Sequence, residues 1–454
     1  MSFLKDVFKR NNIIDEEDIK LSKSQYEAVT TKAPNCLVIA GAGSGKTRVI
    51  TERVKYLLKN GAEPSGIVVI TYTNLAAEEI KIRLSDVRGI SDVFIGTIHS
   101  FANRVMRNSS NQSYTLLTSE IYNMFFRELI TKYAKFLTFE RFLKYMDLRK
   151  NADLGIISEI EANSFLSVSE QCEFCIFEGK TVPNTYEWKD EEYPETVKTL
   201  MVKNNTITFN QLLKKATGYF KSINSEMEHL LVDEFQDVGS LEYNFFVSLK
   251  SKNNFFVGDD YQSIYGFKGG NVNIIIKLSK DPTFKVIMLK NNYRNAKCIL
   301  DVAQNVINQV HNKIEKQIVP LNNDDGEVYI DNKKMLKPIL ELIKDEDKDK
   351  LNEWFILVRT NKELYQVQNL LDDLRIPNHT FKREGLSLAS LNNILKYNSI
   401  KLLTVHTSKG LENKNVILYG NFPLKQPKYR RNEEERKVMY VGITRAKENL
   451  IILN

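Results

Sequence analysis

The string that most constrains this fold is AGAGSGKT, which runs from Ala40 to Thr47. An apolar run, CLVIA (36–40), precedes it, and a stretch with helical spacing, TRVITERVKYLL, follows it. A glycine-rich turn between a buried strand and a helix lets backbone N–H groups surround phosphates, with Lys46 at the terminal phosphates and the Thr47 hydroxyl on Mg²⁺. The strict pattern has glycine where Ala40 stands, but the strand–turn–helix context favours a P-loop. The residues expected to cradle a nucleotide here are Gly41, Ala42, Gly43, Ser44, Gly45, Lys46 and Thr47.

Short apolar runs alternate with helical patterns on both sides of a long helical stretch. The first set of expected strands is CLVIA, IVVITYT (67–73), VFIGT (93–97), HLLVDE (229–234) and NNFFVGD (253–259). The second set is FKVIMLKNN, EVYID, EWFILVRTN, IKLLTVHTSKG, NVILYGN and NLIIL. Strands alternating with helices indicate βαβ units and parallel sheets, so the fold class is α/β.

The pattern changes between Met106 and Asn205, where helical segments rich in Phe, Tyr and Lys replace the strands. This stretch is expected to be a helical insertion. The expected division is a first α/β lobe formed by 1–106 and 205–277, an insertion at 107–204, and a second α/β lobe at 278–454.

A carboxylate pair follows the apolar strand pattern in LLVDEFQD (230–237). An Asp at a strand end beside a P-loop is the expected partner of Mg²⁺, which assigns that place to Asp233. The adjacent Glu234 can orient and deprotonate an attacking water. An Asp-Glu pair at a strand end is otherwise a common surface feature, and its position after a P-loop favours catalysis.

Three other residues suit nucleotide chemistry less specifically. Gln25 in LSKSQYEAV precedes the P-loop, and a glutamine can grip the N6/N7 edge of adenine, although an exposed glutamine is uninformative. Arg294 in NNYRN and Arg445 in YVGITRAKENL lie in the second set of strands and helices. Arginines offered to a γ-phosphate accelerate its transfer, but each could equally form a surface salt bridge.

Net charge and cysteine content limit the binding partners and the cellular compartment that this chain can have. A net charge of +7 over 454 residues permits a nucleic-acid partner without demonstrating one. Four cysteines in such a length argue against a disulfide scaffold and favour a reducing, cytoplasmic location. No run is long and uncharged enough to cross a bilayer, so no membrane association is expected. The CEFC pair (172–175) lacks a second ligand pair for zinc or iron–sulfur and is read as two core thiols.

Taken together, the motifs resemble the ordered set of the UvrD/Rep/PcrA branch of superfamily 1 DNA helicases. They occur in the family order: LSKSQYEAV, AGAGSGKT, TYTNLAAEEIKIRL, GTIHSFANRVMR, LLVDEFQD, VGDDYQSIYGFKGG, LKNNYRN, ILVRTN, LTVHTSKGLE and YVGITRAKENLII. The match covers nearly the whole chain outside 107–204. It implies two RecA-like P-loop lobes, 1A and 2A, a helical 1B insertion, and ATP with Mg²⁺ bound between the lobes, whose cleft opens and closes with hydrolysis.

The resemblance also implies a role for each matching residue. At the base of the nucleotide, Gln25 would read adenine, and Arg48 and Tyr293 would sandwich the ring. At the phosphates, Lys46, Thr47, Asp233 and Glu234 would act as described above, and Gln262 would sense the γ-phosphate. From the second lobe, Arg294 and Arg445 would be arginine fingers, and Glu412 would contact the nucleotide. Along single-stranded DNA or a tailed duplex, the matching residues are Tyr72, Tyr265 and Phe267 stacking on bases, and Thr97, His99, Lys268, Arg359, Asn361 and His406 lining the backbone path. Stacking is sequence-tolerant, which suits a motor on any sequence, whereas the alternative for these aromatics is a place in the core.

Several positions depart from the family pattern. Leu75 stands where relatives carry Lys, Lys268 replaces an Arg, and Glu242 replaces a Gln, while Val238 and Gly239 replace Thr-Asn. Only about forty residues separate Asn361 from Leu403, too few for the 2B domain that relatives insert there, and one helix is expected in them. The chain also stops directly after the last motif, without a nuclease domain, so translocation is better supported than unaided unwinding.

Three functions remain open at this point. The first is a DNA-stimulated ATPase that translocates 3′ to 5′, the polarity that the family implies. The second is a helicase-like regulatory or DNA-sensing subunit that acts with a partner such as a nuclease or repair factor, similar to the helicase-like subunits of Gabija-type phage defence. The third is an RNA motor, although the DDYQSIYGF form of the motif favours DNA.

Overall fold

The structure is a computed structural model. It describes residues 21–110, 114–117, 119–153, 165–167, 170, 195–223, 226–266, 269–322, 326–331, 335–381, 386–422 and 431–454. The predicted DNA contacts Phe267 and Lys268 and the CEFC pair lie outside the described residues.

The first lobe is built on a six-stranded parallel sheet in the order β3-β2-β6-β7-β1-β8. The strands are β1 (Asn35–Ala40), β2 (Ile67–Thr71), β3 (Phe94–Thr97), β6 (His229–Val232), β7 (Asn253–Gly258) and β8 (Lys285–Leu289). Helices cover both faces, so central strands such as β1 and β2 are apolar and buried along almost their whole length. These helices are α2 (Lys23–Thr30), α3 (Lys46–Lys59), α4 (Asn74–Arg83), α5 (Ile98–Ser110), α11 (Phe209–Ser222), α12 (Ser240–Ser248) and α13 (Val272–Leu278).

The expected boundary between the lobes, after residue 277, is wrong by one strand. β8 pairs in parallel with β1, with Cys36 opposite Lys285 and Ala40 opposite Leu289, so it completes the first sheet. An isolated apolar run such as KVIML predicts a buried strand. It does not indicate which sheet the strand joins, because the strands that pair with it lie far away in the sequence.

The second lobe carries a six-stranded parallel sheet in the order β11-β16-β15-β12-β14-β13. Its strands are β11 (Glu327–Asp331), β12 (Trp354–Val358), β13 (Asn378–His379), β14 (Ile400–Thr404), β15 (Asn413–Tyr419) and β16 (Ala446–Leu453). Its helices are α14 (Lys297–Ile307), α15 (Leu336–Glu346), α16 (Asn361–Asp373), α17 (Leu388–Lys396), the one-turn α18 (Val405–Ser408) and α19 (Arg431–Ile443). The predicted α/β class with two parallel-sheet lobes is confirmed.

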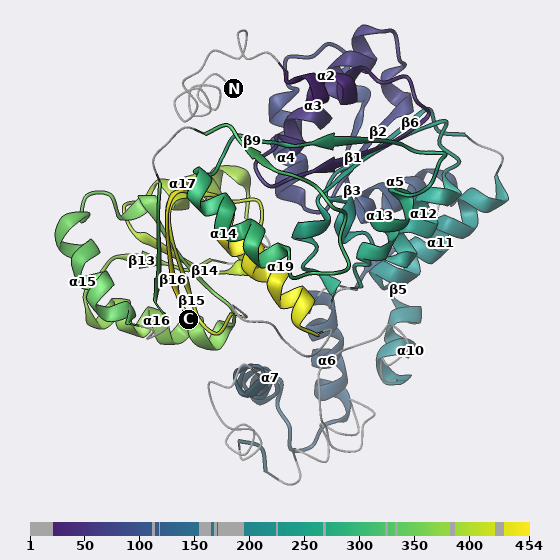
Figure 1. Ribbon diagram of the computed structural model, residues 1–454. Coiled ribbons are helices and arrows are strands. Elements are labelled where there is room, and N and C mark those ends of the chain that lie inside the picture. The colour runs from purple at the N-terminus through teal and green to yellow at the C-terminus, as the bar shows by residue number, and fades with distance from the viewer. Residues whose placement is uncertain are drawn as a thin grey trace.

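The described part of the insertion is helical and has its own small core. It contains α6 (Ser119–Tyr133), α7 (Phe139–Asp153) and α10 (Glu195–Lys203), and Figure 1 shows these helices projecting below the first lobe. Phe125, Phe142 and Leu200 are among the residues buried in this core. A two-stranded ladder of β4 (Thr115–Leu116) and β5 (Thr206–Ile207) joins the two ends of the insertion at the first lobe.

The two lobes share an apolar interface. The core of the second lobe, which includes Ile299 of α14 and Met439 of α19, also takes in Ala42, Leu75 and Tyr261 from the first lobe. Figure 1 shows α14 and α19 lying between the two sheets.

One contact across this interface is made by a helix that the sequence did not predict. α17 lies in the short connection where only α16 was expected, and the Leu388 backbone N–H donates to the Glu78 carboxylate of α4 at 3.0 Å. Leu75, the residue that replaces a family lysine, is 5% exposed in the same apolar cluster as Leu388 and Leu391 of α17.

Candidate functional site

The P-loop has the backbone that its glycines predict. Gly43 (φ 61°) and Gly45 (φ 84°) adopt left-handed conformations that residues with a Cβ rarely take. The Ser44 hydroxyl donates to the Gly41 carbonyl at 2.8 Å and closes the turn. α3 begins at Lys46, so the N–H groups of its first turn and its dipole face the loop, which is the arrangement that binds phosphate.

A segment that follows β8 packs directly onto this loop. Asn292 Nδ2 donates to the Ala42 carbonyl at 2.7 Å, and the Tyr293 N–H donates to the Gly43 carbonyl at 3.0 Å. A Cβ on Gly43 would lie 2.7 Å from Cβ of Arg294, so only glycine permits this approach. Tyr293 and Arg294 therefore reach the loop from the link between the lobes and not from the second sheet.

Gln25 supports the loop from the other side. Its Nε2 donates to the Ser44 carbonyl at 3.0 Å, and its Oε1 accepts from the Ser22 N–H at 3.0 Å as part of the capping box of α2. The side chain is only 3% exposed. In this conformation the amide holds the loop in place, and a contact to adenine would require it to exchange these partners.

The two predicted carboxylates lie together at the end of β6. Asp233 is 4% exposed, and one of its oxygens accepts from the Glu234 N–H at 2.9 Å. Burial, and then the negative charge of Glu234, raise the pKa of Asp233, while Lys46 opposes the rise. Burial would also raise the pKa of Glu234, but the positive charges of Lys46 and Lys409 outweigh it and lower that pKa. Glu234 has φ 52°, a left-handed conformation that is uncommon for glutamate and typical of strained functional sites.

The donor set here fits a magnesium ion. Thr47 offers a hydroxyl and Asp233 a buried carboxylate, and hard oxygen ligands from one or two side chains are what Mg²⁺ takes from a protein. The buried carboxylate of Asp233 and the half-buried one of Glu234 repel each other, and a divalent cation would offset that repulsion. Such an ion, when bound with a nucleoside triphosphate, neutralises charge on the β- and γ-phosphates. Within the described residues, no group of three or more His, Cys, Asp or Glu side chains is arranged as a metal site.

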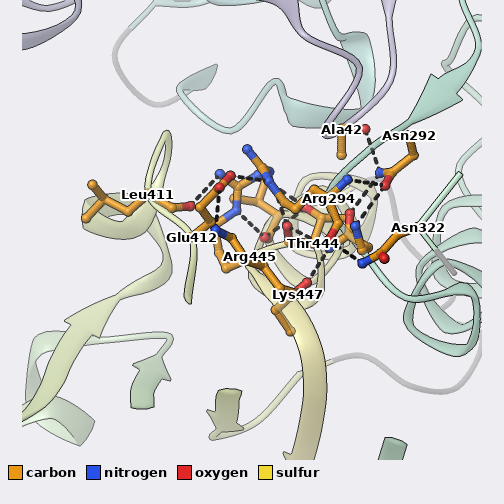
Figure 2. Close-up of polar contacts among 12 residues, drawn as sticks. Ala42, Asn292, Arg294, Asn322, Leu411, Glu412, Thr444, Arg445 and Lys447 are labelled. Atoms are coloured by element: carbon orange, nitrogen blue, oxygen red, sulfur yellow. Dashed lines mark hydrogen bonds and ion pairs between the residues drawn. The ribbon is translucent and has the colours of Figure 1, made fainter. Parts of the chain in front are cut away.

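The two predicted arginine fingers lie near each other (Figure 2). Arg445 is 1% exposed, and its guanidinium donates to the carbonyls of Val441 (2.9 Å) and Leu411 (3.1 Å). Burial, and then the nearby charge of Arg294, lower the pKa of Arg445 to about 9. The guanidinium is thus charged at neutral pH and held rigidly at the end of α19.

Arg294 is paired with a carboxylate that was predicted to contact the nucleotide. Its Nε forms an ion pair with Glu412, and its Nη1 donates to the Thr444 carbonyl at 3.3 Å. Glu412 also pairs with Lys447 at 3.0 Å. Burial would raise the pKa of Glu412, but Arg294 and Lys447 lower it to about 2. Figure 2 shows Arg294 between Glu412 and the P-loop partner Asn292.

Gln262 of the first lobe forms hydrogen bonds with two residues of the second lobe. One is Arg445, and the other is Lys409, which the sequence did not indicate. Arg445 Nη2 donates to Gln262 Oε1 at 3.2 Å, and Gln262 Nε2 donates to Asp259 at 2.6 Å. Lys409, which follows α18, donates to the Gln262 carbonyl at 3.0 Å and to the Asp237 carboxylate, and lies 3.9 Å from Glu234. Its position in LTVHTSKGLE, next to residues already chosen, is the only signal that could have indicated it.

Three of the predicted DNA contacts gather beside this junction. The rings of Tyr72, which follows β2, and Tyr265 stack with centroids 5.1 Å apart and an interplanar angle of 12°. The Tyr265 hydroxyl donates to the His406 carbonyl of the second lobe at 3.3 Å. Lys409 Nζ lies 4.9 Å from the centre of the Tyr265 ring. The aromatic pair thus touches the residue that also reaches Glu234.

The other predicted DNA contacts that the structure describes lie outside this group, and some of them already have partners. Thr97 ends β3, and its Oγ1 accepts from the Ser100 N–H at 3.3 Å. His99 packs edge-on against Phe209 at 4.9 Å, and burial lowers its pKa to about 4, so its imidazole is neutral. Asn361 is exposed at the start of α16. Arg359 is held by Glu435, as described below.

A cavity of about 530 Å³ lies behind the P-loop and contains none of the predicted site residues. It is lined by α14, by residues 315–318 and by Pro320 and Tyr440. Ile318 separates it from the loop, since a Cβ on Gly41 would lie 3.1 Å from this side chain.

Comparison with known proteins supplies the family. Residues 21–283 match the UvrD/REP helicase N-terminal domain, and residues 287–386 and 379–454 match the UvrD-like helicase C-terminal domain. The chain belongs to the UvrD/REP helicase family. The resemblance inferred from the motifs is thereby confirmed. None of the helices in the described ranges has the length and apolar character that crossing a bilayer requires.

Individual relatives of this UvrD-like chain carry helicase names. A probable DNA helicase of Mycoplasma pneumoniae is 28% identical over 96% of this chain and 83% of its own length. The ATP-dependent DNA helicase Rep of Buchnera aphidicola is 29% identical over 84% of this chain and 60% of its own length. The ATP-dependent DNA helicase PcrA of Leuconostoc citreum is 26% identical over 79% of this chain and 49% of its own length. The chain therefore spans about half of the PcrA relative and somewhat more of Rep.

Proposed function

We propose that this chain is an ATP-dependent DNA helicase motor that translocates 3′ to 5′ along single-stranded DNA. The observation that carries the proposal is the hydrogen bond from Arg445 of the second lobe to Gln262 of the first. Gln262 lies in the same short segment as Tyr265, which stacks on Tyr72. A change at the phosphate side of the cleft is therefore transmitted through one segment to the aromatic pair.

On the nucleotide side, the proposal gives each residue a task that its surroundings support. Lys46 and the α3 N-terminus bind the phosphates, and Thr47 with Asp233 holds Mg²⁺. Glu234, kept ionised by Lys46 and Lys409, orients and deprotonates the attacking water. The further residues proposed for the nucleotide are Gln25, Arg48 and Tyr293 at the base, Gln262, Arg294 and Arg445 at the γ-phosphate, and Glu412 from the second lobe.

On the DNA side, Tyr72 and Tyr265 supply a stacking surface at the junction of the lobes. Every base has a π-face, so stacking holds a strand without reading its sequence. His406, whose pKa is lowered to about 4 by burial and then by Arg359, is neutral and can hydrogen-bond a backbone oxygen or sugar. The other residues proposed for the strand are Thr97, His99, Phe267, Lys268, Arg359 and Asn361.

We expect single-stranded DNA to raise the steady-state rate of ATP hydrolysis severalfold or more, because the strand and the γ-phosphate share the Gln262 junction. The rate is measured with Mg²⁺ and saturating oligonucleotide. Lys46→Ala and Glu234→Gln define the background, since each removes one group from the phosphate site. An ATPase rate in the wild type that DNA leaves unchanged would contradict the motor proposal.

Two further arms of this assay separate finer alternatives. Matched RNA that stimulates as strongly as DNA would point to an RNA motor. The 3′ to 5′ direction is tested by release of streptavidin from biotin placed at either end of the strand. Faster release from the 3′ end than from the 5′ end would reverse the proposed polarity.

We expect Tyr265→Ala and Tyr72→Ala each to weaken binding to single-stranded DNA by roughly 5- to 150-fold, because stacking contributes about 1–3 kcal/mol per base. Tyr329→Ala is the control, since this ring is 54% exposed on β11, away from the stacked pair. Fluorescence anisotropy with a labelled oligonucleotide measures the three dissociation constants. Equal losses in all three variants would show that the stacked pair has no special role.

A second candidate is a DNA-sensing or regulatory ATPase subunit that acts with a nuclease or repair factor. The observation that favours it is the short connection between α16 and β14, which replaces the large insertion of relatives with α17. Under this proposal the chain binds DNA and hydrolyses ATP but separates strands poorly by itself. Efficient unwinding of a tailed duplex by the purified chain would contradict it, and a co-purifying nuclease would support it.

A further inference from the structure

Arg359 is already bound by a carboxylate of its own chain. It follows β12, and its Nε and Nη2 donate to the two oxygens of Glu435 at 2.6 Å and 2.5 Å. This two-pronged geometry is the one in which an arginine binds a phosphate group. Both side chains are 30% exposed, so the pair is half-buried and solvent can reach it.

The pair lies at the proposed strand site. The charges of Arg359 and Glu435 both act on the pKa of His406, the first lowering it and the second raising it. His406 is in turn 6.1 Å from the Tyr265 ring, measured between ring centres. Glu434 is close by as well, because a Cβ on Gly266 would lie 3.0 Å from its carboxylate.

Acidic residues in the first turn of a helix have an ordinary explanation, which is the favourable interaction with the helix dipole. That explanation fits Glu433, whose carboxylate accepts from the His311 N–H at 3.1 Å. It does not account for Glu435, whose two oxygens are both used by one arginine from another element. Glu433 and Glu435, two residues apart in α19, thus provide a matched pair of carboxylates on one helix.

We propose that Glu435 sets the affinity of the strand site by occupying the phosphate-binding fork of Arg359, so that an entering DNA phosphate must displace it. The inference rests on the proposed DNA-binding function and deepens it. A single phosphate ion competes poorly with a carboxylate already in place. A strand that also stacks on Tyr265 and Tyr72 has further contacts to offset the displacement. Glu435 therefore selects extended, base-bearing polyanions over small anions.

The test is the affinity for a labelled single-stranded oligonucleotide at several salt concentrations. We expect Glu435→Gln to bind about three- to tenfold more tightly than wild type at low salt, because an exposed bidentate pair is lost and Arg359 is released. The plot of log K against log salt should steepen by about 0.7, the contribution of one phosphate contact on a single strand, because in the wild type the freed charge of Glu435 offsets that contact. Glu433→Gln, with the same charge change, should stay within about twofold of wild type.

A double-variant cycle shows whether the effect passes through Arg359. In an Arg359→Ala background, Glu435→Gln should give no gain, and a gain of the same size there would overturn the proposal. Weaker or unchanged binding by Glu435→Gln would overturn it too, since it would show that Glu435 merely orients Arg359. If that variant lacks a cooperative thermal transition, Glu435→Asp, whose shorter carboxylate cannot keep both bonds, must show an intermediate gain. A wild type that binds no single strand would instead defeat the proposed function.

Discussion

Replacing Arg445 by lysine is expected to lower the rate of ATP hydrolysis by about 10³-fold or more, the effect of losing an arginine finger in related chemistry. The guanidinium is fixed by the Val441 and Leu411 carbonyls and reaches Gln262 across the cleft. A lysine keeps the charge but carries its donors on one nitrogen, so it cannot span the three contacts that Nε, Nη1 and Nη2 of the planar guanidinium make. The variant should therefore stabilise the transferring phosphate less well and lose the hydrogen bond to Gln262 that connects the lobes.

Two measurements separate this loss from unfolding or from loss of binding. A fluorescent ATP analogue should bind Arg445→Lys nearly as tightly as wild type, because the P-loop and Lys46 are untouched, so the defect falls on kcat and not on KM. Arg83→Lys is the control, since Arg83 pairs with Glu79 on the exposed face of α4. A variant that hydrolyses ATP within tenfold of wild type would show that Arg445 is a structural residue.

The second large effect is on stability. Replacing Lys316 by methionine is expected to lower the free energy of unfolding by about 3–5 kcal/mol, the cost of leaving buried charge without its partner. Lys316 Nζ contacts Asp259 at 2.5 Å, Asp260 at 2.7 Å and the Ala40 carbonyl at 3.0 Å. Both aspartates are fully buried, and the ammonium lies 3.9 Å from the Tyr261 ring centre. Burial would lower the pKa of Lys316, but the two carboxylates reverse this and raise it.

Denaturant unfolding of Lys316→Met measures the loss. Lys285→Met provides the comparison, because the Lys285–Glu27 pair is about half exposed and solvent screens it, so the unfolding midpoint should hardly move. Adding Asp259→Asn and Asp260→Asn to Lys316→Met should recover part of the lost stability, since no unpaired charge then remains. Equal unfolding midpoints for Lys316→Met and Lys285→Met would mean that water reaches Asp259 and Asp260 and hydrogen-bonds to their carboxylates.

Local patterns predicted the parts of the site that are built from neighbouring residues. Asn35–Ala40, the phosphate loop and α3 are contiguous, so strand burial, glycine conformation and helix start could all be inferred from one short string. The same holds for Asp233 and Glu234 at the end of β6. The order of motifs then placed Arg445 and Gln262, whose contact across the cleft the structure displays.

Contacts between distant segments were beyond such patterns. Lys409 and Asp237 are 172 residues apart, and Arg359 and Glu435 are 76 apart, so nothing local indicates either pairing. Lys316 lies in a loop with no motif, and its burial follows only from the way that loop crosses behind Ala40. The sequence did not predict that β8 joins the first sheet or that α17 forms, for the same reason. Each depends on a contact with a distant segment of the first lobe.

The short helix α17 has a mechanical consequence. It belongs to the second lobe in sequence but is fastened to α4 through Glu78 and the apolar cluster around Leu75. Any swing of one lobe against the other must therefore break this attachment or drag α4 along. Because α4 starts at Asn74, just after Tyr72, a helix that remains attached would act as a lever on the ring of Tyr72 and displace it with every swing.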